Sequence, residues 1–251
     1  MDTLPDIAAE LQRIIEQAQQ HGIRLRVIGG LAVRLHCPSA SHRSLERTYP
    51  DIDLVTDKAS AKKLAELLPS LGYTPNKSFN TLSGDRRQLY YDERHGRQID
   101  VFIGDFEMCH KLPLSGRLEV EPFSVPLAEL FLSKAQIVQL NRKDVLDLVA
   151  LLLDHPVAAG DDETINRERI AELCARDWGL YTTVTNTLRV LSDLLGRGEV
   201  QLEEGQRQLV EQRIATLHAA LEAAPKTSGW KLRARLGTRV RWYQEVEEVR
   251  R

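Results

Sequence analysis

The sequence has few cysteines, and they form no recognisable pattern. Cys37, Cys109 and Cys174 lie far apart and are odd in number, and no Cys-x-x-Cys occurs. Disulfide frameworks and thiolate zinc sites both need closely or regularly spaced cysteines. Neither is indicated here, and a reducing cytoplasm is the compartment that we expect.

Long apolar runs and a strong net charge are also missing. Nowhere do about 18 apolar residues follow one another without interruption, as a membrane-spanning helix requires. The N-terminal residues lack the basic region and apolar core of a secretory signal, so we expect neither secretion nor a membrane partner. The net charge of −2 over 251 residues excludes a surface that is basic everywhere, so any affinity for nucleic acid must come from a local patch.

What the sequence does contain is a pair of aspartates in an apolar stretch. Side chains alternate between the two faces of a strand, so Asp51 and Asp53 point the same way while Ile52 and Leu54 point into the core. Two carboxylates this close repel each other unless a cation lies between them. Oxygen ligands of this kind suit Mg²⁺ or Mn²⁺, which promote in-line attack on phosphorus. The pair therefore predicts a metal site that acts on a phosphate.

Two further elements complete the predicted site. The apolar strand expected over residues 97–103 carries Asp100, which adds a third carboxylate if this strand lies beside the first. Gly29 and Gly30 follow the apolar run 25–28 and precede a helix-like segment. Glycine backbone at a helix N-terminus lets a phosphate approach closely. The glycines are therefore candidates for binding phosphate next to the metal.

Taken in order, these motifs resemble a known family. Gly-Gly after a strand, then Arg-Thr-x-x-Asp-Ile-Asp-Leu over residues 47–54, then a later hydrophobic-Asp-hydrophobic strand, looks like the minimal nucleotidyltransferases of the DNA-polymerase-β superfamily, especially the abortive-infection toxin-like branch. Lys134 and the run 141–148 are similar to the lysine and Lys-Asp-x-x-Asp-Leu helices of that branch. The resemblance covers roughly residues 5–155.

The resemblance implies transfer of a nucleoside monophosphate from an NTP to an acceptor hydroxyl, with release of pyrophosphate. Asp51, Asp53 and Asp100 would bind the metal, and Asp100 would also help to deprotonate the acceptor. Arg47 and Lys134 would neutralise the triphosphate. Three alternatives stay open: a tRNA or protein acceptor as in toxin-like relatives, a small-molecule acceptor as in antibiotic-modifying relatives, or nucleotide binding without catalysis.

The remaining periodicity predicts an α/β (α+β) fold in two domains. Residues 1–156 would form a nucleotidyltransferase-like domain with a small mixed sheet flanked by helices, and residues 157–251 a helical C-terminal domain after a linker over 157–163. In the first domain we expect helices over 5–21, 31–36, 61–71, 126–140 and 143–155, and strands over 25–28, 51–55, 86–91, 97–103 and 117–123. Helices over 166–177, 180–195 and 202–224 are expected in the second domain. The active cleft would lie between the two domains.

The C-terminal residues 226–251 are locally basic. Eight lysines and arginines oppose three glutamates, a net charge of +5. An apolar stripe at helical spacing predicts that one helix face docks on the protein, with members Leu232, Leu236, Val240, Tyr243 and Val246. The arginines off that stripe are either a solvated helix face or a surface that steers an RNA acceptor, with Trp230 or Trp242 stacking on a base. These arginines are Arg233, Arg235, Arg239 and Arg241.

Overall fold

The computed structural model describes residues 2–245, which form two compact units. The first unit comprises residues 2–35, Thr48–Phe106 and Leu112–Pro126, and the second comprises His36–Arg47, Glu107–Lys111 and residues 127–245. Contacts thus group residues 127–156 with the C-terminal helices. The predicted domain boundary at residue 156 stays a prediction, and each unit is described by itself below.

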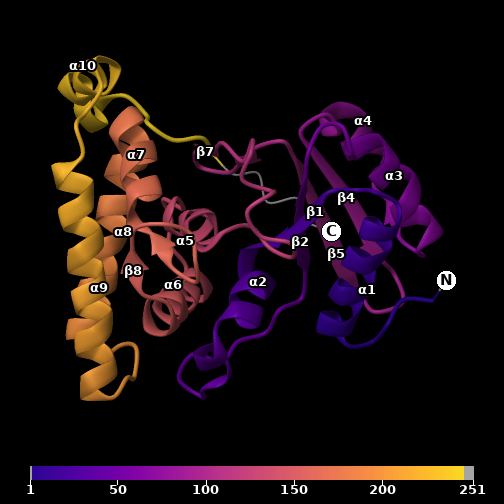
Figure 1. The fold of residues 1–251 in the computed structure, drawn as a ribbon, viewed down its shortest axis with the longest axis horizontal. Coiled ribbons are helices and arrows are strands. Elements are labelled where there is room, and N and C mark those ends of the chain that lie inside the picture. The colour runs from indigo at the N-terminus through magenta and orange to yellow at the C-terminus, as the bar shows by residue number, and fades with distance from the viewer. Residues whose placement is uncertain (1, 246–251) are drawn as a thin grey trace. The chain divides into compact units, whose positions relative to one another are not determined.

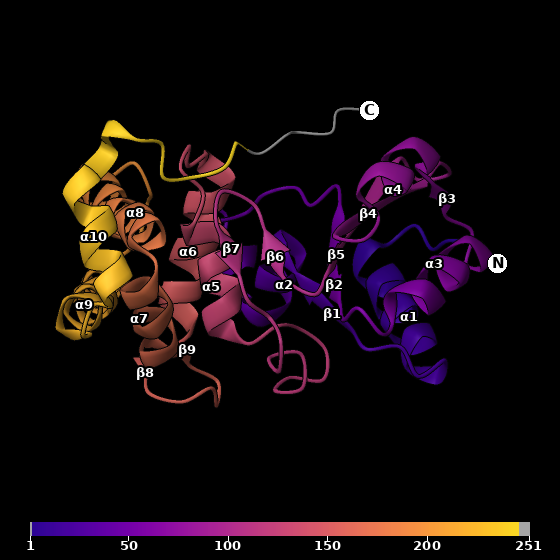
Figure 2. The same cartoon turned by 90° about the horizontal axis from the view of Figure 1, so that it is seen from above.

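The first unit is built on a mixed five-stranded sheet with the order β1-β2-β5-β4-β3 (Figures 1 and 2). The strands are β1 (Leu25–Ile28), β2 (Ile52–Thr56), β3 (Thr74–Pro75), β4 (Arg87–Asp92) and β5 (Arg97–Ile103). β2 and β5 pair in parallel, and the other neighbours pair antiparallel. The predicted fold class, a small mixed sheet flanked by helices, is confirmed.

The two central strands are apolar almost throughout because they are covered on both faces. Ile52, Leu54 and Val55 of β2 are fully buried, and Ile99 and Val101 of β5 are buried beside them. The flanking helices are α1 (Ile7–Gln20), α2 (Gly29–His36), α3 (Ala61–Ser70) and α4 (Lys77–Ser83). α1 and α3 lie on the same side of the sheet (Figure 2) and turn their leucine and isoleucine faces inward. The aspartates of β2 and β5 are therefore the exceptions in an apolar layer.

One predicted strand of this unit is wrong. Residues 117–123 form turns and bends rather than a strand, and the backbone pairs with the sheet just after them, in an isolated bridge between Val27 and Ser124. The Val27 amide donates to the Phe123 carbonyl at 3.0 Å, and the Val125 amide donates to the Val27 carbonyl at 3.1 Å. Pro122 offers no amide hydrogen, which explains why the pairing does not extend toward the N-terminal side. α4 and the short β3 were not predicted.

The second unit is mostly helical, as predicted for the C-terminal part of the chain. Its helices are α5 (Leu127–Ala135), α6 (Arg142–Asp154), α7 (Arg167–Arg176), α8 (Trp178–Gly196), α9 (Glu204–Ala223) and α10 (Ser228–Leu236), with 3₁₀ turns at Pro38–Ser41 and Gly237–Arg239. It also contains a two-stranded sheet of β8 (Val157–Ala158) and β9 (Ile165–Asn166). A second small sheet, β6 (Phe106–Glu107) with β7 (Lys111–Leu112), has residues in both units. α5 ends earlier than expected, and the expected linker begins as a strand.

The predicted C-terminal helix face is also wrong. α10 ends at Leu236 because Gly237 takes a positive φ of 57°, and the chain leaves the helix there. Leu232, Leu236 and Val240 are 65%, 52% and 53% exposed, so they do not dock on the protein. Val246, the last member of the expected stripe, lies outside the described residues. In the part of the chain that the structure describes, no helix has the length and apolar character needed to cross a membrane.

Candidate functional site

Strand register brings the three predicted aspartates together in the first unit. Asp53 of β2 and Asp100 of β5 are direct partners in the parallel ladder, so their side chains leave the same face of the sheet. Asp51 lies just before β2 on that face, and its Oδ1 accepts a hydrogen bond from the Gln98 amide at 3.4 Å. Asp51 is exposed, Asp53 is half-buried, and Asp100 is 4% exposed. The carboxylates therefore run from the surface into the sheet.

Gly29 is a glycine because the Asp53 carboxylate lies against it. Ile28 of β1 is the ladder partner of Asp53, and the chain turns from β1 into α2 at Gly29, with a φ of 75°. A methyl group on Gly29 would lie 2.3 Å from Asp53 Oδ2. Both glycines, Gly29 and Gly30, are buried. The Gly-Gly turn thus gives room to the carboxylate, and its predicted contact with phosphate stays a prediction.

Asp100 has a partner that the sequence reading did not foresee. Arg87 of β4 donates from Nε to Asp100 Oδ1 at 2.8 Å and from Nη2 to Asp100 Oδ2. Leu89 is the ladder partner of Asp100, so Arg87, two residues away on β4, lies diagonally across on the same face. The result is a bidentate ion pair in which both oxygens of the third carboxylate accept from one guanidinium.

The electrostatics of the cluster follow from burial and from these charges. Burial raises the pKa of Asp100, the bond from Arg87 offsets part of that rise, and the negative charge of Asp51 adds to it. Burial lowers the pKa of Arg87. The bond to Asp100 and the charges of Asp100 and Asp53 raise this pKa by more, so the net shift is upward. Each of the three aspartates is thus electrostatically coupled to a member of this one cluster.

The donor atoms fit a hard divalent cation only in part. Asp51 and Asp53 offer carboxylate oxygens, which Mg²⁺ and Mn²⁺ prefer. Both oxygens of Asp100 accept from Arg87. Among residues 2–245, no three histidine, cysteine or acidic side chains are arranged as a ready metal site. Asp51 and Asp53 thus have the oxygen donors that such an ion prefers, whereas Asp100 would have to give up its bidentate bond to Arg87.

The two predicted phosphate-binding cations form a second cluster, in the second unit. Arg47 donates from Nε and Nη2 to the two oxygens of Asp147, each at 2.7 Å. Lys134 Nζ lies 3.0 Å from Asp147 Oδ2 and 3.3 Å from Asp144 Oδ1. Asp147 is 2% exposed and the Arg47 side chain 10% exposed, so the charges are largely out of water. The sequence does not say whether the helix face shared by Asp144 and Asp147 is exposed or functional. In the structure this face binds Arg47 and Lys134.

The arginines of α10 and of the segment after it do not form one free surface. Arg233 donates to the carbonyls of Gly237 at 2.8 Å and Val240 at 2.7 Å, and its guanidinium lies 4.7 Å from the centre of the Trp178 ring. Arg241 pairs with Glu245 at 2.8 Å. Arg235 and Arg239 are exposed.

The two tryptophans proposed for base stacking are packed within the second unit. Trp230 makes an edge contact with Tyr181, with ring centres 5.3 Å apart. Trp242 makes edge contacts with Trp178 and Tyr243, and its Nε1 donates to the Thr183 hydroxyl at 3.1 Å. Both rings are half-buried. An RNA base would have to share or displace these contacts.

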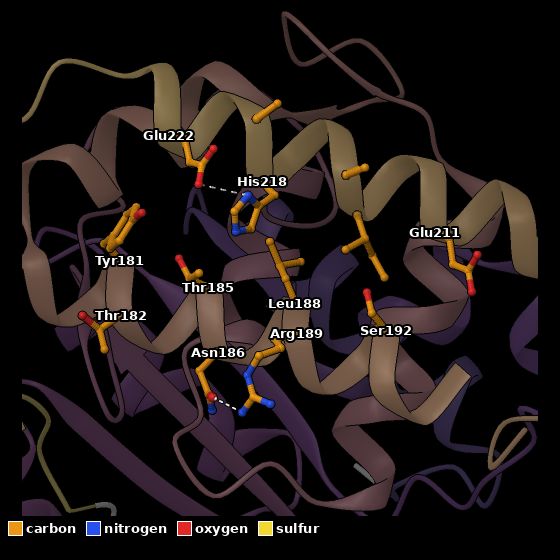
Figure 3. A pocket seen from close by; sticks show the side chains of 13 residues that line it. Tyr181, Thr182, Thr185, Asn186, Leu188, Arg189, Ser192, Glu211, His218 and Glu222 are labelled. Carbon is orange, nitrogen blue, oxygen red and sulfur yellow. Dashed lines mark hydrogen bonds and ion pairs between the residues drawn. The ribbon is translucent and has the colours of Figure 1, made fainter. Parts of the chain in front are cut away.

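An open groove of about 730 Å³ runs between α8 and α9, and it contains none of the predicted site residues (Figure 3). Its wall carries the hydroxyls of Tyr181, Thr182 and Ser192, and at one end His218 pairs with Glu222 at 3.6 Å. Leu188 and Ile214 are among its apolar lining residues. The volume suits a small organic molecule, but periodicity marked these helices only as core-forming.

Arg87 is the residue of the site that sequence reasoning missed. It lies in the expected strand 86–91, two residues before the buried Leu89, so the two side chains point to the same face of the sheet. An arginine on a buried face is the one sign in the sequence that it needs a charged partner. Assigning it to Asp100 needs the β4–β5 register, which the sequence does not state.

Comparisons with known proteins identify the family of the chain. Residues 6–184 match a protein family described as uncharacterised nucleotidyltransferase. None of the curated proteins matches the chain. Among solved structures, an antigenic nucleotidyltransferase-like protein from Paracoccidioides brasiliensis is similar over 91% of this chain and 97% of its own, with 16% identity and a TM-score of 0.41. The STING-associated CdnE c-di-GMP synthase from Capnocytophaga granulosa matches over 85% and 82%, with 11% identity and a TM-score of 0.23. The two structural likenesses are too weak to argue from.

Proposed function

Because this chain belongs to a nucleotidyltransferase family, we propose that it moves a nucleoside monophosphate from an NTP to an acceptor hydroxyl. The acceptor oxygen forms a bond to the α-phosphorus, the bond from that phosphorus to the β-phosphate oxygen breaks, and pyrophosphate leaves. The hydroxyl proton passes to a base, the role predicted for Asp100. The observation that carries the proposal is the ladder pairing of Asp53 with Asp100, with Asp51 on the same face.

Asp51 and Asp53 are the residues that would hold a divalent cation, Mg²⁺ or Mn²⁺. When bound, such an ion neutralises phosphate oxygens and orients them for in-line displacement. Gly29 supports this assignment because its missing side chain leaves room for the Asp53 carboxylate. Gly30 and the first turn of α2 would contact phosphate through backbone amides.

Arg47 and Lys134 are the proposed counter-charges of the triphosphate. Both are held by Asp147, so their positive ends are already gathered at one point of the second unit. A bidentate guanidinium and an ammonium are the usual partners of phosphate oxygens. Nucleotide binding would then exchange part of the bonding to Asp147 for bonding to phosphate.

We further propose the abortive-infection toxin-like branch, the cytoplasm as its compartment, and RNA such as tRNA as the acceptor. The support for RNA is Lys231, Arg235 and Arg239, exposed cations that have no ion pair among the described residues. Arg233 is left out because it binds backbone carbonyls, and Arg241 because it pairs with Glu245. A small-molecule acceptor is the second candidate, favoured by the 730 Å³ groove between α8 and α9. Nucleotide binding without catalysis is the third outcome of the test.

Incubation with each α-labelled NTP, Mn²⁺ or Mg²⁺ and a cell extract tests the proposal. Label that moves to RNA, together with pyrophosphate release, supports the RNA acceptor, and label in small molecules or protein replaces it. Lys231→Ala/Arg235→Ala/Arg239→Ala should then reduce RNA labelling and the salt dependence of RNA binding, since each phosphate contact contributes to that dependence. NTP binding with no label transfer and no pyrophosphate would leave a binding protein.

A further inference from the structure

Arg87 is held on three sides in the carboxylate cluster. Its Nε and Nη2 bind the two oxygens of Asp100. The ring of Phe102 lies 5.0 Å and that of Phe79 5.9 Å from the guanidinium carbon. A bidentate ion pair flanked by aromatic rings is both directional and partly desolvated, so the guanidinium has one preferred position. It is a fixed part of the site.

Asp100 is poorly placed to bind a metal ion while Arg87 is there. Only 6% of its side chain is exposed, whereas Asp51 is exposed and Asp53 half-buried. A divalent ion at Asp100 would have to lie beside a guanidinium that already neutralises the carboxylate, and two cations on one carboxylate repel each other. Asp100 is therefore the most buried of the three aspartates, and both of its oxygens are bound by Arg87.

Arg87 still has a donor to offer. Its Nη1 makes no hydrogen bond to the described residues, and the side chain is 21% exposed. A guanidinium stays charged at any pH that a folded protein tolerates. Such a group, set beside two carboxylates that would hold a cation, can contact an anionic oxygen of the substrate.

We infer that Asp100 is a positioning residue that holds Arg87, and that Arg87 supplies the second positive charge of the site in place of a second metal ion. The inference rests on the proposed function, because Asp51 and Asp53 are taken to bind the first ion. It assigns to Asp100 a role different from the metal ligand and base that the sequence predicts, so the proton of the acceptor hydroxyl would pass to a water molecule instead. The ligand that Arg87 meets is a phosphate oxygen of the nucleotide.

Mn²⁺ binding, followed by electron paramagnetic resonance of the free ion, measures this without any turnover. The wild-type chain should bind one Mn²⁺. Asp53→Asn should weaken that binding by about tenfold or more, because a charged ligand is lost. Asp100→Asn should weaken it less, by about threefold, because Arg87 loses its counter-charge but the ion loses no ligand. A larger loss for Asp100→Asn, equal to that of Asp53→Asn, would overturn the inference.

Removing the charge of Arg87 should strengthen Mn²⁺ binding rather than weaken it. Arg87→Met keeps the length and the contacts with both phenylalanines but frees Asp100, so a second Mn²⁺ should bind, or the first should bind about tenfold tighter. Arg87→Lys retains the charge and should still bind one ion. Arg87→Met/Asp100→Asn should return to one ion, and it leaves no unpaired buried charge, so it stays testable if Arg87→Met alone does not fold.

The possible failures are distinguishable. If the wild-type chain binds no Mn²⁺, the proposed function and this inference fall together. If it binds one ion that Asp53→Asn loses, and Asp100→Asn loses it too, only the inference falls. Binding of two ions by the wild-type chain would likewise contradict Arg87 as the second cation and leave the proposed function intact.

Discussion

Replacing Asp147 with Asn should destabilise the second unit strongly. The substitution keeps the shape of the side chain and removes its charge, so Arg47 loses the partner of both its fork nitrogens and Lys134 loses the closer of its two carboxylates. All three side chains are largely out of water. Removing one partner of a buried ion pair costs about 3–5 kcal/mol, because the other charge stays buried.

We expect the lower end of that range. Asn can still accept one hydrogen bond from Arg47, and Lys134 keeps Asp144 at 3.3 Å. The free energy of unfolding should therefore fall by about 3 kcal/mol. If the cluster acts as a unit, Arg47→Gln/Asp147→Asn should cost less than the sum of the two single variants.

Tryptophan fluorescence in urea measures this unit selectively. The three tryptophans of the sequence, Trp178, Trp230 and Trp242, all belong to the second unit. Asp193→Asn is the matched control, since Asp193 forms an exposed ion pair with Arg189 at 3.1 Å. This substitution should lower the free energy of unfolding by less than about 1 kcal/mol. If Asp147→Asn is no less stable than this control, the reasoning about the buried cluster is refuted.

Three further predictions concern single residues. Gly29→Ala and Gly22→Ala should each lower the free energy of unfolding by about 1–2 kcal/mol, because both glycines have positive φ. Only Gly29→Ala should lose Mn²⁺ binding, since only its methyl group would displace a carboxylate. Equal Mn²⁺ binding by the two variants would contradict this. Burial raises the pKa of Asp92, but hydrogen bonds, chiefly from Arg97, lower it to about 2. The ionised Asp92 side chain therefore stabilises the fold fully above the unfolded pKa of about 3.9, and this stabilisation is lost as the pH falls through 2. Asp92→Asn should thus flatten acid unfolding followed by circular dichroism, and an unchanged acid limb would argue against it. Lys134→Ala should weaken NTP binding by about 1.5–3 kcal/mol in calorimetry while the exposed Lys143→Ala does not, and equal affinities would return Lys134 to a purely structural role.

The fold of the first unit was largely predictable because its strands carry strong local signals. The alternation in 51–55 and the apolar run in 97–103 identify β2 and β5, and both are where they were expected. Asp53 and Asp100 could be expected to meet because hydrophobic-Asp-hydrophobic strands in one sheet place their acids on a common face. The turn and bridge around Ser124 could not be foreseen, since a single bridge leaves no periodic trace.

The ion pairs of the site were not predictable, because they join residues far apart in the chain. Arg47 and Asp147 are 100 residues apart, and nothing local to either marks the other. Arg87 and Asp100 meet only through the β4–β5 register. The C-terminal stripe was misread because helical spacing continued past Gly237, whereas the backbone leaves the helix there. The sequence pattern thus predicts helices and strands, whereas the tertiary packing decides which side chains form ion pairs.

The most direct test of the account is the rate of pyrophosphate release by Asp53→Asn. Loss of a metal ligand at a reacting phosphate should lower the rate by orders of magnitude, several kcal/mol in the barrier, while the fold stays as stable as the parent. Asp85→Asn, the same substitution at an exposed aspartate of the first unit, should keep the parental rate. If Asp53→Asn releases pyrophosphate at the parental rate, the carboxylate cluster is not the catalytic site.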